Sequence, residues 1–312
     1  MTKRFQNHVA ESRHSLPLVA VYAFVVWTAA GLFPQQWWVQ LACFAVAAFL
    51  MLILNNSYAL LRIYSRMVSS AFLVLSCTAC FLFDSLKGGI VQLCLIASCL
   101  MLFRCYRDKQ ALGWTYYAFL CIGLASTIFV QTLYFVPLLW LLMVTHLNAL
   151  SGRTFVVSLF GVLTPYWFAI GWFIFQQDYD TLIGHFTALA EFQPVCDYSQ
   201  LTLSQLLVFA LTIILLTTGM VHFLRNSFKD KIRTRQFYGY FMIMAWASAI
   251  FLMLQPQHYD VLMRLIIINT APVIAHFIAL TYTKVTNVAF YVIVAACLLV
   301  TGYNLWISSS IF

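Results

Sequence analysis

Residues 201–224 read LTLSQLLVFALTIILLTTGMVHFL and contain no Asp, Glu, Lys or Arg. An α-helix needs about 20 mostly apolar residues to cross the hydrocarbon core of a bilayer. We therefore predict a membrane-spanning helix here. Runs of the same kind recur from one end of the sequence to the other.

These apolar runs fill most of the chain, and we count about eleven of them. They lie at residues 16–33, 37–54, 67–83, 88–103, 114–130, 133–150, 154–175, 201–224, 237–254, 261–282 and 286–308. Together with short connections they use all 312 residues, which leaves no room for a soluble domain. We predict a single all-α integral membrane domain, residues 1–312, that is, a polytopic membrane protein.

Three of the runs are open to more than one interpretation. Residues 67–83 and 88–103 form either two full spans or a hairpin that dips into the membrane and returns, because the second is short. The first run, 16–33, is either a cleaved signal peptide or a retained anchor. We favour the anchor because another span follows at once.

Composition excludes several classes of protein. The chain is 63% hydrophobic and only 8% charged, whereas a soluble domain carries about 25% charged residues. The net charge of +8 is spread over many short loops, which is typical of membrane topology and not of nucleic-acid binding. Among the nine cysteines, Cys77 and Cys80 are three positions apart within an apolar run, but no His or further Cys nearby completes a metal set, so we predict no metal site and no cofactor.

The basic residues predict an orientation. If the amino terminus lies inside, all of the 17 Lys and Arg residues except Lys87 and Arg264 fall on the inner side. We therefore predict a bacterial inner-membrane protein with its amino terminus inside, its carboxyl terminus outside and an odd number of spans. Most of the nine acids then fall outside, namely Asp84, Asp178, Asp180, Glu191, Asp197 and Asp260.

The longest polar interruption is residues 176–200, QQDYDTLIGHFTALAEFQPVCDYSQ. We predict an outer amphipathic helix that Asp180 caps and Pro194 ends. Its apolar stripe would comprise Leu182, Ile183, Phe186, Leu189, Ala190 and Gln193.

The polar side of this helix has two interpretations. In the first, it faces water at the membrane surface. In the second, it forms one wall of a cleft, and His185 and Glu191 are candidate catalytic residues. Asp178 and Asp180 are candidate substrate-binding residues, since carboxylates two positions apart also suit a divalent cation. The surface-helix interpretation is favoured.

A second outer site is predicted at residues 255–264, QPQHYDVLMR. Asp260 and Arg264 are four residues apart, so they can pair on one helix face. One interpretation is an interfacial ion pair. The other is an anion clamp in which Arg264 binds substrate and His258 and Asp260 are candidate catalytic residues.

Two other polar stretches have structural interpretations. Residues 55–66, NNSYALLRIYSR, are too polar to span and are predicted to form a helix on the membrane surface. Asn269, Pro272 and His276 share one face of a predicted span. A hydrogen-bonded helix contact is favoured there over a proton relay.

Two stretches carry a family resemblance: residues 116–144, YYAFLCIGLASTIFVQTLYFVPLLWLLMV, and 151–175, SGRTFVVSLFGVLTPYWFAIGWFIF. They resemble the membrane core of GT-C type glycosyltransferases at Gly123, Ala125, Pro137, Arg153, Gly161 and Pro165. The whole chain is also similar to multi-pass membrane proteins of the Bacteroidota kind. In GT-C type glycosyltransferases the catalytic acids lie on a long first outer loop. Here that loop is only residues 34–36, so the resemblance implies no catalytic residue.

Three functions follow as hypotheses. The absence of a recognised catalytic motif favours a non-enzymatic membrane component of a larger assembly, with the lipid bilayer and other membrane subunits as partners. The resemblance implies a transferase or polymerase acting on a lipid-linked glycan at the outer leaflet. A transporter of lipid or small anions is the third, although no span carries a central Asp or Glu for ion coupling.

Overall fold

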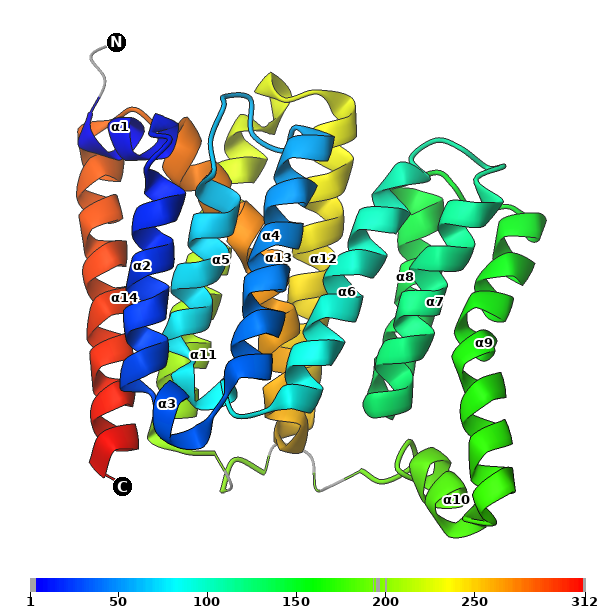
Figure 1. Cartoon of the computed structure of the whole chain (residues 1–312). Helices are drawn as coiled ribbons and strands as arrows, with labels where there is room; N and C mark the ends of the chain where they lie inside the picture. Colours follow the sequence, from blue (N-terminus) through cyan, green and yellow to red (C-terminus); the bar gives the residue numbers. More distant parts are fainter. Residues whose placement is uncertain (1–3, 193, 195–196, 200, 311–312) are drawn as a thin grey trace. The chain divides into compact units, whose positions relative to one another are not determined.

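The computed structural model describes residues 4–192, 194, 197–199 and 201–310, and all regular structure within these residues is helical (Figure 1). The predicted all-α class is confirmed. The chain divides into two compact units, residues 1–89 with 198–312 (unit 1) and residues 90–197 (unit 2).

Unit 1 contains nine α-helices and three short 3₁₀ turns among the described residues. They are α1 (Phe5–Glu11), α2 (Ser15–Ala29), α3 (Leu32–Gln35), α4 (Trp38–Tyr58), α5 (Met67–Thr78), η1 (Cys80–Leu82), α11 (Leu203–Asn226), η3 (Ser227–Lys229), α12 (Ile232–Leu254), η4 (Pro256–His258), α13 (Tyr259–Leu280) and α14 (Lys284–Ser310). Unit 2 contains α7 (Leu112–Ile128), η2 (Val130–Tyr134), α8 (Phe135–Thr145), α9 (Gly152–Gln176) and α10 (Tyr179–Thr187). Helix α6 (Leu86–Arg104) begins in unit 1 and continues into unit 2.

Seven helices within the described residues are long and apolar enough to cross a membrane: α4, α6, α9, α11, α12, α13 and α14. Four further apolar segments are shorter, namely α2, α5, α7 and the η2–α8 pair. Each of these segments overlaps one predicted run. The membrane character is therefore confirmed, whereas the count of eleven crossings stays a prediction.

Helix α13 is the central element of unit 1 and contacts α5, α11 and α12. Every residue from Val261 to Ala279 is buried. Gly219 permits a close approach of the two backbones, because a Cβ there would lie 2.8 Å from the carbonyl oxygen of Val273. The polar side chains from residue 261 to residue 279 are consequently enclosed by protein.

The amino-terminal helix α1 covers the end of α13 (Figure 1). The last carbonyls of a helix have no partner within it. Here Gln6 Nε2 donates to the carbonyl of Ile278 at 2.5 Å, and Asn7 Nδ2 donates to that of Thr281 at 2.8 Å. Both amide side chains are buried. Residues ahead of the first apolar run thus cap the central helix.

In unit 2, α7 and α9 pack at close range through two glycines. A Cβ on Gly123 would lie 2.6 Å from the carbonyl oxygen of Val162, and one on Gly161 would lie 2.7 Å from that of Tyr116. A Cβ does not come that close to a carbonyl oxygen, so both positions require glycine.

Two predicted helices are corrected. No helix begins at residue 55; α4 continues to Tyr58 and ends at Ala59, which has a left-handed φ of 46°. Asn55 is buried because its Nδ2 donates to the carbonyl of Ser65 at 2.8 Å. The chain therefore folds back without a surface helix.

Helix α10 is shorter than the amphipathic helix predicted within residues 176–200. Asp178, not Asp180, is its N-cap residue, with a carboxylate oxygen that accepts from the backbone of Thr181 at 3.2 Å. The helix ends at Thr187, before Pro194. The predicted stripe residue Gln193 lies outside the described residues.

Candidate functional site

The predicted pairing of Asp260 and Arg264 is present at the start of α13. Arg264 Nε donates to Asp260 Oδ1 at 2.8 Å. Arg264 Nη2 also donates to the carbonyl of Leu82, on η1. The guanidinium is almost fully buried, with 10% of the side chain exposed, whereas 38% of the Asp260 side chain is exposed. Arg264 therefore joins α13 to the connection between α5 and α6.

Ser85 completes this cluster of Asp84, Ser85, Asp260 and Arg264, which we call the acidic cluster. The Ser85 hydroxyl donates to Asp260 Oδ2 at 2.6 Å and accepts from the backbone N–H of Gly88 at 3.1 Å. Both oxygens of Asp260 are thus used within unit 1. This arrangement confirms the ion pair and leaves Arg264 largely enclosed.

Asp84 lies beside this pair. Asp84 is exposed as a residue, but the partial burial of its carboxyl raises the pKa of that group, the neighbouring Asp260 carboxylate raises it further, and Arg264 opposes both effects. A carboxyl group with a raised pKa therefore stands next to the buried guanidinium.

The third residue predicted for this site, His258, lies on η4 immediately before α13. Its Nε2 lies 3.2 Å from Nε2 of Gln257, and its ring packs against Phe251 at a centroid distance of 6.0 Å. Both contacts are local to the α12–α13 connection.

The candidates in unit 2 have different surroundings. His185 Nε2 lies 3.4 Å from the hydroxyl of Tyr166 on α9, and partial burial lowers the pKa of His185. Asp178 caps α10, whereas Asp180 is exposed. Glu191 is also exposed and follows the end of the helix, so it does not share a helical face with His185.

The segment after α10 is tied to η2 within the same unit. Gln131 Nε2 donates to the carbonyl of Ala188 at 3.2 Å, and the Tyr134 hydroxyl donates to that of Leu189. The segment that follows α10 is therefore held by side chains from η2 as well as by the capped start of α10.

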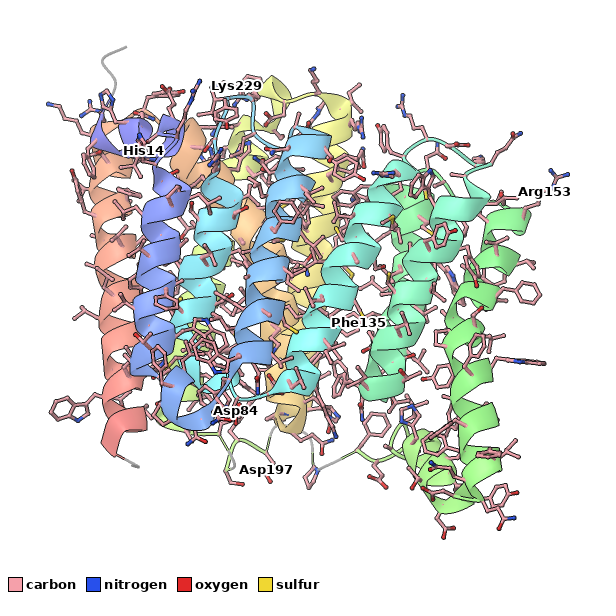
Figure 2. All side chains as sticks on the ribbon, viewed as in Figure 1. His14, Asp84, Phe135, Arg153, Asp197 and Lys229 are labelled. Atoms are coloured by element: carbon pink, nitrogen blue, oxygen red, sulfur yellow. The ribbon has the colours of Figure 1, made fainter. Side chains whose placement is uncertain are left out.

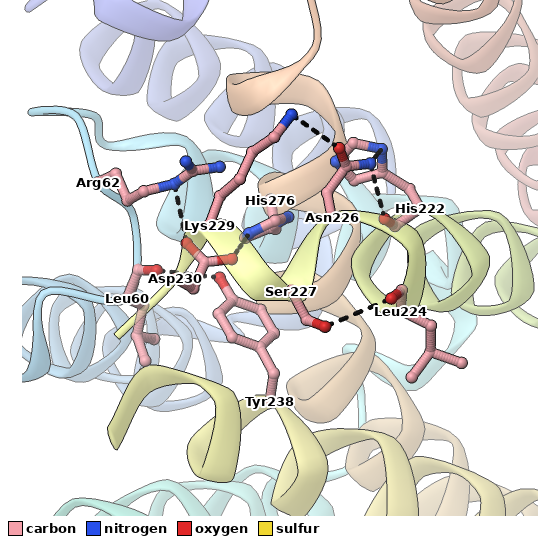
Figure 3. A network of polar contacts seen from close by, with 10 residues as sticks. All are labelled: Leu60, Arg62, His222, Leu224, Asn226, Ser227, Lys229, Asp230, Tyr238 and His276. Carbon is pink, nitrogen blue, oxygen red and sulfur yellow. Dashed lines mark hydrogen bonds and ion pairs between the residues drawn. The ribbon is translucent and has the colours of Figure 1, made fainter. Parts of the chain in front are cut away.

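Sequence reasoning missed a second cluster in unit 1, at the connection between α11 and α12 (Figure 3). The Asp230 side chain is fully buried; its Oδ1 forms an ion pair with Arg62 Nε at 2.8 Å, and its Oδ2 lies 3.1 Å from His276 Nε2. His276 is fully buried, and 36% of the Arg62 side chain is exposed. We call Arg62, His222, Asp230 and His276 the histidine cluster.

One signal in the sequence points to this cluster. Asp230 is the only acid in residues 225–236, RNSFKDKIRTRQ. The membrane orientation accounts for the five basic residues of this stretch, but it does not account for an acid among them. The sequence predicts a helix contact for His276, whereas its partner is Asp230 on a connection. Asn269 was grouped with it, yet its Nδ2 donates within its own helix, to the carbonyl of Leu265 at 2.7 Å.

These positions define what each site can do chemically. Among the described residues no group of three or more His, Cys, Asp or Glu side chains is placed to hold a metal ion. The acidic cluster combines a titratable carboxyl with a paired guanidinium, and the histidine cluster combines two imidazoles with a buried ion pair.

The fold and these clusters define a class, a helical membrane protein with ion pairs at the ends of its central helix. Beyond that class, no family model, curated protein or solved structure matches the chain.

Proposed function

We propose that the chain is a non-catalytic, multi-pass component of a larger membrane assembly. It would cross the bacterial inner membrane eleven times, with the amino terminus inside and the carboxyl terminus outside. Its partners would be the bilayer and other membrane subunits. No metal or cofactor enters this proposal.

The observation that carries the proposal is the engagement of Arg264. A guanidinium that binds an anionic substrate needs free N–H donors directed at the ligand. Arg264 instead donates to Asp260 and to the carbonyl of Leu82, and it is almost fully buried. Breaking such a pair by removing one partner costs about 3–5 kcal/mol. Arg264 is therefore better suited to stabilising the helix bundle than to binding a ligand.

The distribution of labelled residues supports the proposed orientation (Figure 2). Within unit 1, His14 and Lys229 lie at one end of the bundle and Asp84 lies at the other. Within unit 2, Arg153 and Asp197 lie at opposite ends. Each unit by itself thus agrees with basic inner and acidic outer connections.

Native mass spectrometry of the tagged full chain, extracted in mild detergent at its natural expression level, tests the proposal. We expect a complex of fixed stoichiometry with other membrane subunits. An unrelated multi-pass protein, tagged and extracted in parallel, controls for lipid-mediated association. A monodisperse lone monomer in two different mild detergents would contradict the proposal.

One observation favours a second candidate, a transferase for a lipid-linked glycan at the outer leaflet. The raised pKa of Asp84 places a potential proton donor beside Arg264. Asp84 is not a partner in the Asp260–Arg264 pair, so Asp84→Asn tests chemistry with little effect on packing. Unchanged surface glycan in Asp84→Asn and Asp260→Asn, at normal protein levels, would reject this candidate.

A further inference from the structure

His222 and His276 meet inside the histidine cluster, and neighbouring groups determine which nitrogen of His222 carries its proton. Asn226 is the key neighbour. Its Oδ1 accepts from Lys229 Nζ at 3.2 Å, and its Nδ2 donates to the backbone carbonyl of His222 at 3.1 Å. A donor on one side and an acceptor on the other fix the orientation of the amide.

The Asn226 orientation in turn determines the tautomer of His222. Nδ2 of Asn226 also faces His222 Nδ1 at 3.3 Å, so Nδ1 accepts this hydrogen bond. A neutral imidazole with an acceptor at Nδ1 carries its proton on Nε2. His222 Nε2 is buried and has no hydrogen-bond partner among the described residues. It is a buried donor without an acceptor.

His276 presents the complementary group. A carboxylate only accepts hydrogen bonds, so His276 Nε2, 3.1 Å from Asp230 Oδ2, carries the proton. In the neutral ring Nδ1 is then an acceptor. The side chain is fully buried, and Nδ1 likewise lacks a partner within the described part of the chain.

The two rings are neighbours. Their centroids lie 5.5 Å apart with an interplanar angle of 51°. Figure 3 shows the His276 ring between Asp230 on one side and His222 with Asn226 on the other. An unused donor and an unused acceptor therefore occur on buried nitrogens of adjacent rings without a direct hydrogen bond to each other.

We propose that one water molecule bridges His222 and His276, accepting from Nε2–H of His222 and donating to Nδ1 of His276. A buried water is stable where it meets two or more polar groups that otherwise lack partners. Leaving a buried polar group unsatisfied is costly, so the bridge stabilises both rings.

The bridge has a consequence for the whole cluster. Hydrogen bonds then run in one direction from Lys229 through Asn226, His222, the water and His276 to Asp230. Phe223 and Tyr238 pack edge-on against His276, at centroid distances of 5.1 and 4.9 Å, and shield this chain with aromatic surface. Low local polarity strengthens such a chain.

Solid-state nuclear magnetic resonance of the ¹⁵N-histidine-labelled full chain in lipid tests the proposal. The sequence has seven histidines, so single substitutions assign every ring. We expect both His222 and His276 to be protonated on Nε2 alone, and magnetisation to transfer from water to both rings. A ring protonated on Nδ1, or a ring without transfer from water, would overturn the proposal.

Two variants separate the water site from general folding. In His222→Phe the aromatic shape remains but the donor is lost, so water transfer to His276 should disappear. Persistence of that transfer would refute a bridge between the two rings. In Asn226→Leu the amide that fixes the His222 tautomer is lost, and the His222 proton should divide between its nitrogens. His14→Gln, at an exposed position, should change neither ring.

Discussion

At the scale of single residues, Asp230 shows how the protein handles a buried charge. Its carboxylate contacts both the partly exposed guanidinium of Arg62 and the fully buried imidazole of His276. Asp230→Ala leaves His276 Nε2–H buried without an acceptor. We expect a loss of about 1–3 kcal/mol in the free energy of unfolding, measured by denaturant titration in mixed micelles.

Asp230→Asn is the matched comparison for this prediction. The amide oxygen still accepts from His276, and Arg62 retains its contact with water, so the loss should be smaller than for alanine. Asp180→Ala removes an exposed acid and should change stability by less than about 0.5 kcal/mol. Equal stability of Asp230→Ala and the wild type would mean that the buried pair contributes nothing.

Gly88 provides a second prediction at this scale. A Cβ there would lie 2.5 Å from Asp260 Oδ2 and 2.7 Å from Arg264 Nε. Gly88→Ala should therefore displace the ion pair and reduce stability by about 1–3 kcal/mol. Gly89→Ala is the control on the same helix, since its Cβ would meet only Cys43 at an ordinary 3.6 Å. Similar midpoints of thermal unfolding for the two variants would contradict this steric explanation.

The raised pKa of Asp84 predicts a pH dependence of stability. In the unfolded chain this carboxyl titrates near 3.8, and in the folded chain it titrates higher because of burial and the Asp260 carboxylate. The folded state therefore binds more protons in this window, so stability falls as the pH rises through the folded pKa. Below the unfolded pKa the contribution is fully present.

Asp84→Asn should remove this decline because the amide is uncharged at every pH. The measurement is the midpoint of thermal unfolding of both proteins between about pH 4 and pH 7. The difference between wild type and variant isolates Asp84 from the other acids. Parallel profiles would mean that Asp84 has its ordinary pKa.

At the scale of elements, the α7–α9 pair depends on close backbone approach. Gly161→Ala would place a Cβ 2.7 Å from the carbonyl oxygen of Tyr116 and should destabilise unit 2 by about 1–3 kcal/mol. Gly171→Ala, on the same helix with nothing within 4 Å, should be neutral or stabilise by up to about 1 kcal/mol. Limited proteolysis of the two variants measures the difference, and equal cleavage rates would count against the close-packing argument.

The elements also show what sequence can and cannot predict. Apolar runs located the helices, because span length follows directly from the thickness of the bilayer. Their ends were less predictable: α4 passes through the polar Asn55 because the backbone carbonyl of Ser65, in the following connection, accepts from the Asn55 amide. The cap at Asp178 in place of Asp180 is a similar shift of two residues.

Whether a contact in a site can be predicted depends on how far apart its residues are in the sequence. Asp260 and Arg264 were predicted to pair because they are one helical turn apart. Asp230 and His276 are 46 residues apart, and His185 and Tyr166 are 19 apart, so neither contact has a periodic signature. Gln6 and Asn7 cap α13 from the other end of the chain. Such pairs depend on how the helices pack, which hydropathy alone does not determine.

At the scale of the whole molecule, orientation follows from where the basic connections lie. Arg62, Lys229 and the amino-terminal helix belong to connections at one end of unit 1, and Asp84 belongs to the other end. Because cytoplasmic connections carry the excess of Lys and Arg, the end with Lys229 should face the cytoplasm. The carboxyl-terminal helix α14 then runs outward.

Fusions of green fluorescent protein and of alkaline phosphatase measure this orientation, since the first fluoresces only inside and the second is active only outside. Fusions after Arg107 and Lys229 should fluoresce, and fusions after Gln177 and at the carboxyl terminus should show phosphatase activity. An inside carboxyl terminus would require an even number of crossings. The four short apolar segments α2, α5, α7 and η2–α8 would then include one that enters and leaves the membrane on the same side.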